Sequence, residues 1–295
     1  MQKKNIIINH LRKACHKMKR KVLITGVSQG IGRSIAERFL KEGYILYGTF
    51  NKGRNKAEEL ILEYGKENVN LFEPYDFTNL NDSKRFAKKA AQYNYDAVVF
   101  SAGMFSENDD FNCFDLDDFS KIMNCNFYTP LIITTGLKDS INEGGSIVII
   151  SSNDAYPGAF SSMSYSISKS ALFSLMKCLS VNYGKKNIRV NSVAPGAIDT
   201  AMNTEEQMII SPYFSPIARV GTPLDVAKVV FFLSSEEAGF ISGENITIDG
   251  GYSIESVLLK SEADHNLSIL LRTFISKPEV IDVIKDYAQK NGVSL

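Results

Sequence analysis

The chain has 295 residues with 33 basic and 33 acidic side chains, so its formal net charge is zero and no globally basic surface invites nucleic acid. No apolar run approaches the ~20 residues of a membrane-spanning helix, and the length suits one α/β unit with tails. The four cysteines form no C-x2-C pair and the three histidines lack metal-ligand spacing, so we expect reduced thiols, a cytoplasmic location and no metal site.

Residues 1–20 form a basic segment without Asp or Glu. Ile7, Leu11, Cys15 and Met18 have the spacing of a short amphipathic helix that can touch an anionic surface. The segment lacks the apolar core and small-residue cleavage site of a signal peptide. Two other interpretations remain open, namely a disordered tail and a true start at Met18, directly before the first predicted strand.

A short buried strand is predicted at Lys21-Val22-Leu23-Ile24, and it leads into a glycine-rich turn. The apolar positions after this turn predict a helix that stops at Gly43. Glycine lets the backbone approach a pyrophosphate, and a helix N-terminus favours its charge, so this unit predicts the start of a dinucleotide site. The spacing is Gly-x3-Gly-x-Gly, not the commoner Gly-x-Gly-x2-Gly. The candidate cofactor contacts in the turn are Gly26, Ser28, Gln29, Gly30, Ile31 and Gly32.

The end of the second predicted strand bears on the choice of cofactor. Enzymes that select NAD often place an acidic residue there, but this position is Phe50. Asn51, Lys52 and Arg54 follow, so no carboxylate repels a 2′-phosphate and two cations can attract one. We therefore expect NADP (NADPH) rather than NAD. The alternative is that both cations are ordinary solvated loop residues.

Short apolar segments alternate with amphipathic helices along the rest of the chain. This alternation predicts an α/β fold with one doubly wound, Rossmann-type parallel sheet and helices on both faces. Ligands of such sheets bind beyond the carboxyl ends of the strands, so the segments that follow the strands should converge there. The expected strands are 22–24, 45–50, 69–75, 97–101, 146–150, 189–193 and 245–248, and the longest expected helices are 119–141 and 165–183.

Tyr165 and Lys169 have a spacing that places them on one face of a helix, and Ser152 completes the pattern Ser-x12-Tyr-x3-Lys. An ammonium beside a phenol lowers the phenol pKa from about 10 toward working pH, so Tyr165 can give a proton to a developing alkoxide. The Ser152 hydroxyl can hold the carbonyl oxygen while charge builds there. The alternatives are a solvated helix face for the pair and a helix cap for the serine.

With these motifs in this order, residues 21–252 resemble the single-domain form of the short-chain dehydrogenase/reductase family. Thr25 to Gly32 matches the family's Thr-Gly-x3-Gly-x-Gly, and segments at 219–223 and 249–251 match its closing motifs. The resemblance implies an adenine contact at Asp76, in Asp76-Phe77-Thr78, with Phe77 beside it. It implies further cofactor contacts at Ala102 and Gly103. Phe100 and Ser101 replace the two asparagines that usually precede this pair.

The resemblance also assigns the remaining site residues. Asn126 falls where the family has its catalytic asparagine, which positions a water that links Lys169 to solvent. Lys169 is implied to grip the nicotinamide ribose as well as tune Tyr165. The segment Pro195-Gly196-Ala197-Ile198-Asp199-Thr200 matches the loop that covers the nicotinamide. The contacts implied there are Pro195, Gly196, Ile198 and Thr200. Gln29 counts against NADPH, because NADP-preferring relatives often have a basic residue at that position.

The implied activity is NADPH-dependent reduction of a ketone to a secondary alcohol, with Tyr165 as general acid. The short segment 201–217 is similar to that of 3-oxoacyl-[acyl-carrier-protein] reductases, which implies an acyl-thioester substrate and a possible place in fatty acid biosynthesis. A sugar, polyol or steroid-type alcohol dehydrogenase is the alternative, and a catalytically silent nucleotide-binding scaffold is a further one. The family commonly forms homodimers or homotetramers through its two long helices.

The C-terminal extension, residues 253–295, falls outside the resemblance. Ser276-Lys277-Pro278-Glu279 has the pattern of a capping box that opens a helix, and a second apolar helix is expected before it. Because these apolar faces need cover, we expect the extension to pack on the domain or on a neighbouring copy.

Overall fold

The computed structural model describes residues 19–106, 109, 111–112, 114–159, 162–254 and 256, together with the isolated residues 277, 282 and 285. The amphipathic stripe expected in residues 1–18 and the helices expected in the C-terminal extension lie outside the described residues. Within the part of the chain that is described, none of the helices combines the length and apolar composition that crossing a lipid bilayer requires.

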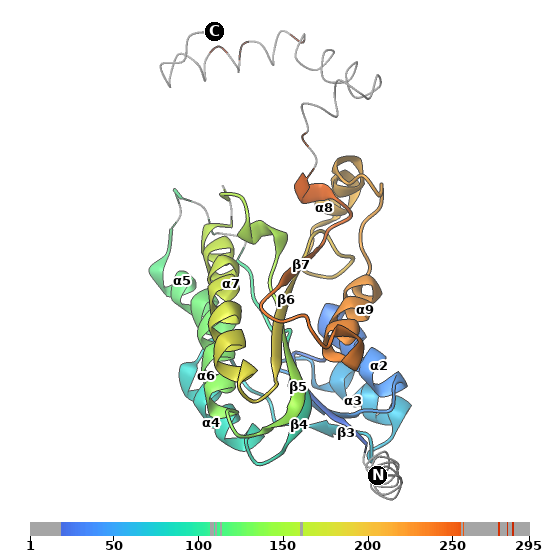
Figure 1. Ribbon diagram of the computed structural model, residues 1–295. Helices are drawn as coiled ribbons and strands as arrows, with labels where there is room; N and C mark the ends of the chain where they lie inside the picture. The colour runs from blue at the N-terminus through green and yellow to red at the C-terminus, as the bar shows by residue number, and fades with distance from the viewer. Residues whose placement is uncertain are drawn as a thin grey trace, which may run out of the picture.

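The fold is built on a sheet of seven parallel strands in the order β3-β2-β1-β4-β5-β6-β7 (Figure 1). The strand order reverses between β1 and β4, which are neighbours in the sheet, so a crevice opens beyond their carboxyl ends. The strands span Lys21–Thr25 (β1), Ile45–Gly48 (β2), Val69–Leu71 (β3), Tyr95–Phe100 (β4), Ile141–Ile150 (β5), Arg189–Pro195 (β6) and Asn245–Ile248 (β7). The sequence prediction of a doubly wound sheet is confirmed.

Helices cover both faces of this sheet (Figure 1). Helices α2 (Gly30–Lys41), α3 (Arg54–Tyr64) and α9 (Pro223–Ser234) lie on one face, and α4 (Leu80–Ala90), α5 (Leu116–Met123), α6 (Thr129–Gly136) and α7 (Met163–Gly184) lie on the other. The short helix α8 (Glu205–Ile210) stands beyond the carboxyl ends of the strands. A π-helical turn, η1 (Asn124–Tyr128), joins α5 to α6, and 3₁₀ turns lie at Asn153–Ala155 (η2), Ser211–Phe214 (η3), Glu236–Ala238 (η4) and Tyr252–Ile254 (η5).

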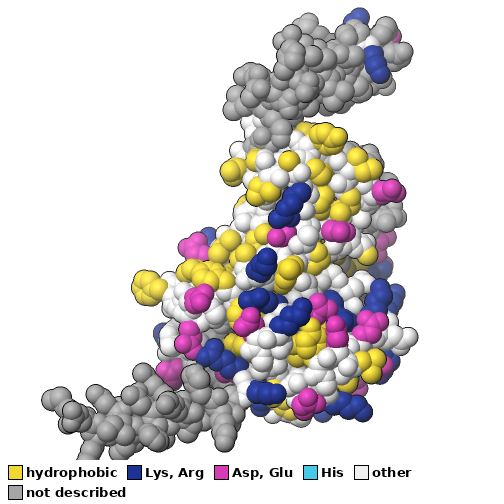
Figure 2. All heavy atoms as spheres, turned by 90° about the vertical axis from the view of Figure 1, so that its right-hand side faces the viewer, with side chains coloured by type: hydrophobic (Ala, Val, Ile, Leu, Met, Phe, Trp, Pro, Cys, Tyr) yellow, Lys and Arg dark blue, Asp and Glu magenta, His cyan; other side chains and the backbone are white. Residues whose placement is uncertain are grey.

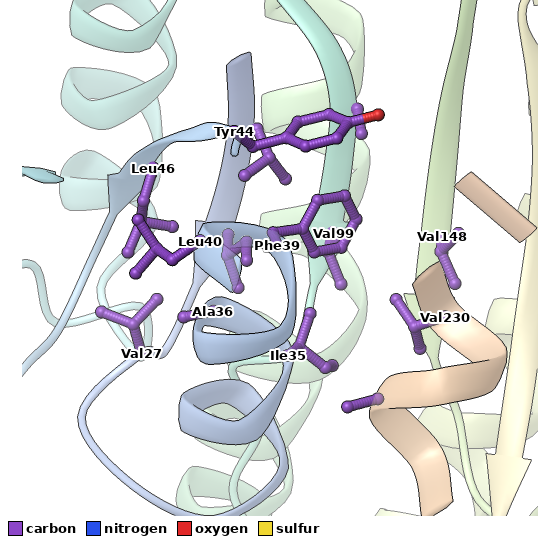
Figure 3. Packing of buried hydrophobic residues seen from close by; sticks show 14 of the residues in the cluster. Val27, Ile35, Ala36, Phe39, Leu40, Tyr44, Leu46, Val99, Val148 and Val230 are labelled. Atoms are coloured by element: carbon purple, nitrogen blue, oxygen red, sulfur yellow. The ribbon is translucent and has the colours of Figure 1, made fainter. Parts of the chain in front are cut away.

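The core on the α2 face fixes the helix that follows the glycine turn. Ile35 and Phe39 of α2 pack against Val99 of β4, and Val230 of α9 lies over Val148 of β5 (Figure 3). All five side chains are fully buried, and each contributes about 1.5–3 kcal/mol of transfer free energy. This packing holds the N-terminus of α2 rigidly beyond the end of β1.

One expected helix, 119–141, was wrong in its continuity and its end. The π-helical turn η1 interrupts it, and α6 ends at Gly136. Ile141 instead begins β5, where it pairs with Tyr95 of β4. The apolar pattern runs on from helix to strand with only a short polar break, so periodicity did not reveal the boundary. The second long helix, expected at 165–183, is observed as α7.

Two expected strands are shorter than their apolar runs. The run 69–75 pairs only as far as Leu71, because Pro74 has no backbone N–H to continue the ladder. The run 45–50 ends as β2 at Gly48, and Thr49 then turns toward the end of β1. Its carbonyl accepts hydrogen bonds from the backbone N–H groups of Gly26 and Val27, so this turn helps to hold the glycine-rich segment.

Candidate active site

A single cleft of about 1950 Å³ runs along the carboxyl ends of the strands. It collects residues from the glycine turn, the segments after β2, β3, β4 and β5, the first turns of α7, and the loop after β6. Of the predicted site residues, Asn126 does not line the cleft. The others all do, namely Gly26, Ser28, Gln29, Gly30, Ile31, Gly32, Asn51, Lys52, Arg54, Asp76, Phe77, Ala102, Gly103, Ser152, Tyr165, Lys169, Pro195, Gly196, Ile198 and Thr200.

The glycine turn is shaped by close backbone contacts. A Cβ on Gly32 would lie 2.0 Å from the carbonyl oxygen of Gly26, so no larger residue fits there. Gly26 itself has φ +77°, and a Cβ on it would lie 3.1 Å from Ala102. The turn therefore packs tightly against the end of β4. Thr25 secures this junction, because its Oγ1 accepts hydrogen bonds from the backbone N–H groups of Ser101 and Ala102, both at 3.1 Å.

The N-terminus of α2 fits the pyrophosphate of a dinucleotide. Its N-cap residue, Gln29, provides no side-chain hydrogen bond, and the first turn contains no acidic residue. The first N–H groups of a helix need an external acceptor, and the helix dipole favours a negative one. Thr200, in the loop after β6, lies against Gly30 on the open side of this turn. This end of the cleft therefore offers backbone groups that suit an anion.

Several cations gather beside this end of the cleft. Lys52 and Arg54 follow β2 as expected, and Arg54 lies 5.4 Å from the ring centroid of Phe50. Arg54 also pairs with Glu58 at 3.3 Å. The sequence analysis missed two further cations that line the cleft, Arg33 and Lys56. Both could have been found from the sequence. Arg33 lies one helical turn after Gln29 of the glycine turn, and Lys56 lies two residues after Arg54.

These two additional cations differ in how far their charge is already neutralised. Arg33 forms ion pairs with Glu37, Glu59 and Glu63, so three carboxylates occupy its guanidinium. Lys56 lies near the Gln29 side chain at 3.4 Å and has no acidic partner among the described residues. Lys52 is likewise without an ion pair in the described part of the chain. Lys52 and Lys56 therefore keep the charge available for an anionic ligand.

Ser152, Tyr165 and Lys169 meet at the other end of the cleft, and all three are buried. The Lys169 Nζ lies 5.4 Å from the centroid of the Tyr165 ring and donates a hydrogen bond to the carbonyl of Ile150 at 2.9 Å. Hydroxyl groups tie the turn η2 to α7. Ser151 Oγ donates to the carbonyl of Lys169 at 2.9 Å, and Ser166 Oγ donates to that of Asp154 at 2.7 Å. These hydrogen bonds hold the segment that contains Ser152 against the helix that contains Tyr165.

The protonation states differ from those expected from the sequence. Burial raises the pKa of Tyr165 well above 10, the Asp154 charge raises it further, and the Ser152 hydrogen bond only partly opposes this. The lowering of the Tyr165 pKa that was expected from Lys169 is not observed. Burial lowers the pKa of Lys169 to about 8, against the opposing effects of Cys125 and Asp154. At neutral pH, Tyr165 is therefore a neutral phenol that holds a proton to donate.

Asn126 lies behind the cleft wall, in the π-helical turn. Its Nδ2 donates to the carbonyl of Met104 at 2.9 Å and to Ser168 Oγ at 3.0 Å, and its Oδ1 accepts from the Met104 backbone N–H at 2.8 Å. The side chain therefore connects the segment after β4 to α7. A Cβ on Gly103 would lie 3.4 Å from both Asn126 Oδ1 and Lys169 Nζ, so the two side chains meet at that glycine.

Asp109 is a residue of this site that sequence reasoning missed. Its carboxylate accepts hydrogen bonds from the backbone N–H of Ser164 at 3.0 Å and of Tyr165 at 3.1 Å, and from the Ser164 hydroxyl. It is 5% exposed and caps α7, the helix that contains the tyrosine and the lysine. Because it lies far from Ser164 in sequence, no local capping pattern could have revealed it.

Ser152 also caps the turn η2, since its Oγ accepts from the backbone N–H of Asp154 at 3.1 Å. The capping alternative considered for this serine is thus present together with its place beside Tyr165. The residues that resemble closing motifs have local structural contacts as well. Arg219 forms an ion pair with Asp225 at 2.8 Å, and Asp249 accepts from the backbone N–H groups of Gly251 and Ser253. No cluster of metal-ligating side chains occurs among the described residues.

A doubly wound sheet, a glycine turn at the switch point and a Ser-Tyr-Lys cluster in the same cleft define a dinucleotide-dependent oxidoreductase. The chain belongs to the short-chain dehydrogenase/reductase family. A family model described as enoyl-(acyl carrier protein) reductase matches residues 26–253. Members of this family are oxidoreductases that bind NAD(P), and this chain is therefore an oxidoreductase.

Individual relatives agree with this assignment. The chain is 32% identical over 255 residues to a versicolorin reductase from Emericella nidulans, and the match covers 78% of this chain and 94% of the relative. A solved short-chain dehydrogenase/reductase from Serratia marcescens has 28% identity and a TM-score of 0.74, covering 79% of this chain and 98% of that structure. A blue fluorescent protein from a metagenomic library, solved with NADPH, has 26% identity and a TM-score of 0.74, covering 79% and 97%.

Proposed function

We propose that the protein is an NADPH-dependent reductase that converts a ketone to a secondary alcohol. The observation that supports this most strongly is the burial of Tyr165, Ser152 and Lys169 together, in the same cleft as the glycine turn. A silent scaffold has no need to keep a buried lysine next to a buried tyrosine. Burial disfavours the charged form of a lysine, so a lysine in this position costs free energy. Such a buried lysine is typical of a catalytic site.

Each residue of the cluster has a distinct task in this proposal. The bound dinucleotide supplies the hydride. The Tyr165 hydroxyl gives its proton to the carbonyl oxygen as charge develops there. The Ser152 hydroxyl donates a hydrogen bond to the same oxygen and so stabilises the developing charge. Lys169 holds a positive charge beside the phenol after the proton has left, and it reaches the ribose side of the cleft.

Asn126 acts through its neighbours. Its amide holds the segment after β4 against α7, and this keeps Gly103 and Lys169 in place. We propose that Asn126 also supports the path by which water returns a proton to Lys169, because the asparagine and the lysine meet at Gly103. Proton return is needed once per turnover, since Tyr165 gives up its proton each time.

The preference for NADPH rests on the charges beside the glycine turn. Lys52 and Arg54 lie where the 2′-phosphate of a bound cofactor is expected, and Lys56 adds a third cation. No carboxylate follows β2 to repel that phosphate, because Phe50 occupies the position. The structural relative solved with NADPH supports the same choice. Asp76 and Phe77 would flank the adenine, since both line the cleft after β3.

The substrate is proposed to be a ketone on an apolar frame. The relatives named versicolorin reductase favour a reductase, and the pattern of the closing segments favours a 3-oxoacyl thioester as its substrate. A sugar or polyol remains the second candidate, because the cleft that contains the tyrosine also holds a carboxylate, Asp154.

We also propose a cytoplasmic homo-oligomer that pairs through α7. That helix exposes Ile167 at 44% and Val181 at 77%.

The direct test is a screen of NADPH oxidation by the purified protein over cyclic ketones, aldoses, steroid ketones and 3-oxoacyl thioesters. The proposal expects ketone-dependent oxidation that is faster with NADPH than with NADH. The Tyr165→Phe variant serves as the blank for contaminating reductases. If no carbonyl compound is reduced above that blank with either cofactor, the proposed function is wrong.

A further inference from the structure

Asp154 is a carboxylate in the catalytic part of the cleft to which the proposed reaction assigns no task. It lies two residues after Ser152 in η2, it is exposed, and it is one of the residues that line the cleft. Its backbone is fixed on both sides, since its N–H donates to Ser152 Oγ at 3.1 Å and its carbonyl accepts from Ser166 Oγ at 2.7 Å. Asp154 therefore lines the cleft from a turn whose backbone is held on both sides.

Asp154 lines the same cleft as the catalytic groups, in the turn η2 that directly follows Ser152. Its negative charge raises the pKa of Tyr165 and also that of Lys169. It forms no ion pair with any described residue. Loss of water raises the pKa of its carboxyl group, while a hydrogen bond from Ser152 and the charge of Lys169 act in the opposite direction. A carboxylate in this setting accepts hydrogen bonds only, and it has room for more donors than one hydroxyl provides.

Substrate binding changes the supply of donors to this carboxylate. The single proton of the Ser152 hydroxyl can be donated to one acceptor at a time. When the serine turns to the carbonyl oxygen of a substrate, Asp154 loses that donor. A carboxylate left without a hydrogen-bond donor in a partly dehydrated cleft costs free energy. A donor on the substrate itself can replace the hydrogen bond that Asp154 has lost.

The charges nearby indicate which donor fits. An anionic group is repelled by Asp154, and the available cations gather at the opposite, cofactor-binding end of the cleft. An ammonium brings a second positive charge toward Lys169, whose own charge interacts with that of Asp154. A neutral hydroxyl group avoids both costs. It needs to lie within a few bonds of the carbonyl carbon, since Asp154 adjoins the serine that holds the carbonyl oxygen.

Apolar side chains surround this part of the cleft. Phe105 packs edge-on against the Tyr165 ring with centroids 5.6 Å apart. Met202, Phe214 and Tyr252 also line the cleft, and Met202 and Tyr252 are exposed. Figure 2 shows hydrophobic side chains gathered toward the end of the molecule that includes α8, whereas charged side chains are interspersed over the opposite end. The walls thus suit a carbon ring or chain with few charges.

We infer that Asp154 is a specificity-determining residue that accepts a hydrogen bond from a substrate hydroxyl near the reacting carbonyl, so the preferred substrates are neutral hydroxy ketones on an apolar frame. The inference rests on the proposed ketone reduction and narrows its substrate class. It disfavours 3-oxo acids and other anions that bring a negative charge toward the same carboxylate.

The test compares three ring ketones of similar size: cyclohexanone, 2-hydroxycyclohexanone and 4-oxocyclohexanecarboxylate. The readout is the ratio of kcat/KM for the hydroxy ketone to that for cyclohexanone. A hydrogen bond to a charged acceptor predicts a ratio of about 10 or more in the parent enzyme, with the carboxylate slowest. In Asp154→Asn, whose amide is a weaker acceptor of the same shape, the ratio should fall at least fivefold. Asp199→Asn, a neutralised carboxylate on the loop after β6, should keep the parent ratio.

A second measurement does not depend on any variant. Cyclohexane-1,2-diol should inhibit the parent enzyme at a concentration about tenfold lower than cyclohexanol, because only the diol brings a second hydroxyl to Asp154. Equal reduction of cyclohexanone and its hydroxy derivative, or a ratio unchanged in Asp154→Asn, would overturn the inference while leaving ketone reduction intact. If the parent reduces no ketone at all, the proposed function fails and takes the inference with it.

Discussion

The cap that Asp109 places on α7 gives a quantitative prediction about the active site. The change Asp109→Ala removes acceptors from two backbone N–H groups and one hydroxyl at the start of that helix. Loss of an aspartate cap costs about 0.5–2 kcal/mol, and groups left buried without a partner add to it. Relief of the buried charge subtracts part of that sum. We expect the free energy of unfolding to fall by about 2–3 kcal/mol, or roughly 4–12 °C in melting temperature.

The same change should affect turnover more than stability alone requires. Tyr165 lies in the first turn of α7, and Asp109 bonds its backbone N–H directly. A displacement of the phenol by about 1 Å costs about 10²-fold in rate. We therefore expect kcat on the best ketone from the screen to fall by about that factor at a temperature where the variant is fully folded. Asp109→Asn keeps an oxygen acceptor for Ser164 but places an amide against the Tyr165 N–H, so its kcat should be intermediate.

Asp115 provides a matched control. It is also an aspartate cap, and its Oδ1 accepts from the backbone N–H groups of Asp117 at 2.7 Å and Asp118 at 3.1 Å. It caps α5, which contains none of the proposed catalytic residues. Asp115→Ala should lower the melting temperature less than Asp109→Ala does and leave kcat within threefold of the parent. The reasoning is refuted if Asp109→Ala keeps parental kcat, or if both alanine variants lose turnover alike.

Three further predictions concern cofactor, charge and assembly. Replacing both Lys52 and Arg54 with alanine removes two exposed contacts to a 2′-phosphate, each worth about 1 kcal/mol. Titration should therefore show NADPH binding weakened about 30-fold and NADH binding within threefold of the parent. An equal loss for both cofactors would contradict the proposed preference for NADPH. Ketone reduction should decline as pH rises through about 8, because the Lys169 ammonium loses its proton there while Tyr165, whose pKa lies well above 10, keeps its own. Lys169→Met should lose about 10²-fold or more in kcat and show no such step in its pH profile, so a parental profile in that variant would exclude Lys169 as the titrating group. Val181→Asp should dissociate an oligomer that pairs through α7, which light scattering would detect as a fall in particle mass; an unchanged mass would place any interface elsewhere.

The sequence was sufficient for features that depend on local pattern. Apolar strands such as 189–193 and the glycine spacing from Gly26 to Gly32 predicted the sheet and the anion-binding turn, because each follows from its own few residues. The extent of helix 119–141 was missed, because an apolar run does not show where helical hydrogen bonding gives way to strand pairing at Ile141. Thr25 as the polar link between β1 and β4 also required the register of the two strands.

Features that depend on distant parts of the chain could not be predicted. The Asp109 cap joins segments far apart in sequence, and only the folded chain shows it. The proton-bearing state of Tyr165 was missed for a related reason. Spacing alone places an ammonium near the phenol, but burial is a property of the whole site, and here burial raises the pKa of the phenol. The place of Asp154 in the catalytic cleft also becomes visible only in the folded chain, where the turn η2 packs against α7.

The measurement that tests the central claim most directly compares Tyr165→Phe with the parent in two assays, NADPH binding by fluorescence titration and ketone reduction by initial rates. Phenylalanine keeps the ring that packs against Phe105 and loses only the proton donor. We predict NADPH affinity within threefold of the parent and a loss of about 10²–10⁴-fold in kcat. Turnover within threefold of the parent would contradict the assignment of Tyr165 as the acid that protonates the carbonyl oxygen.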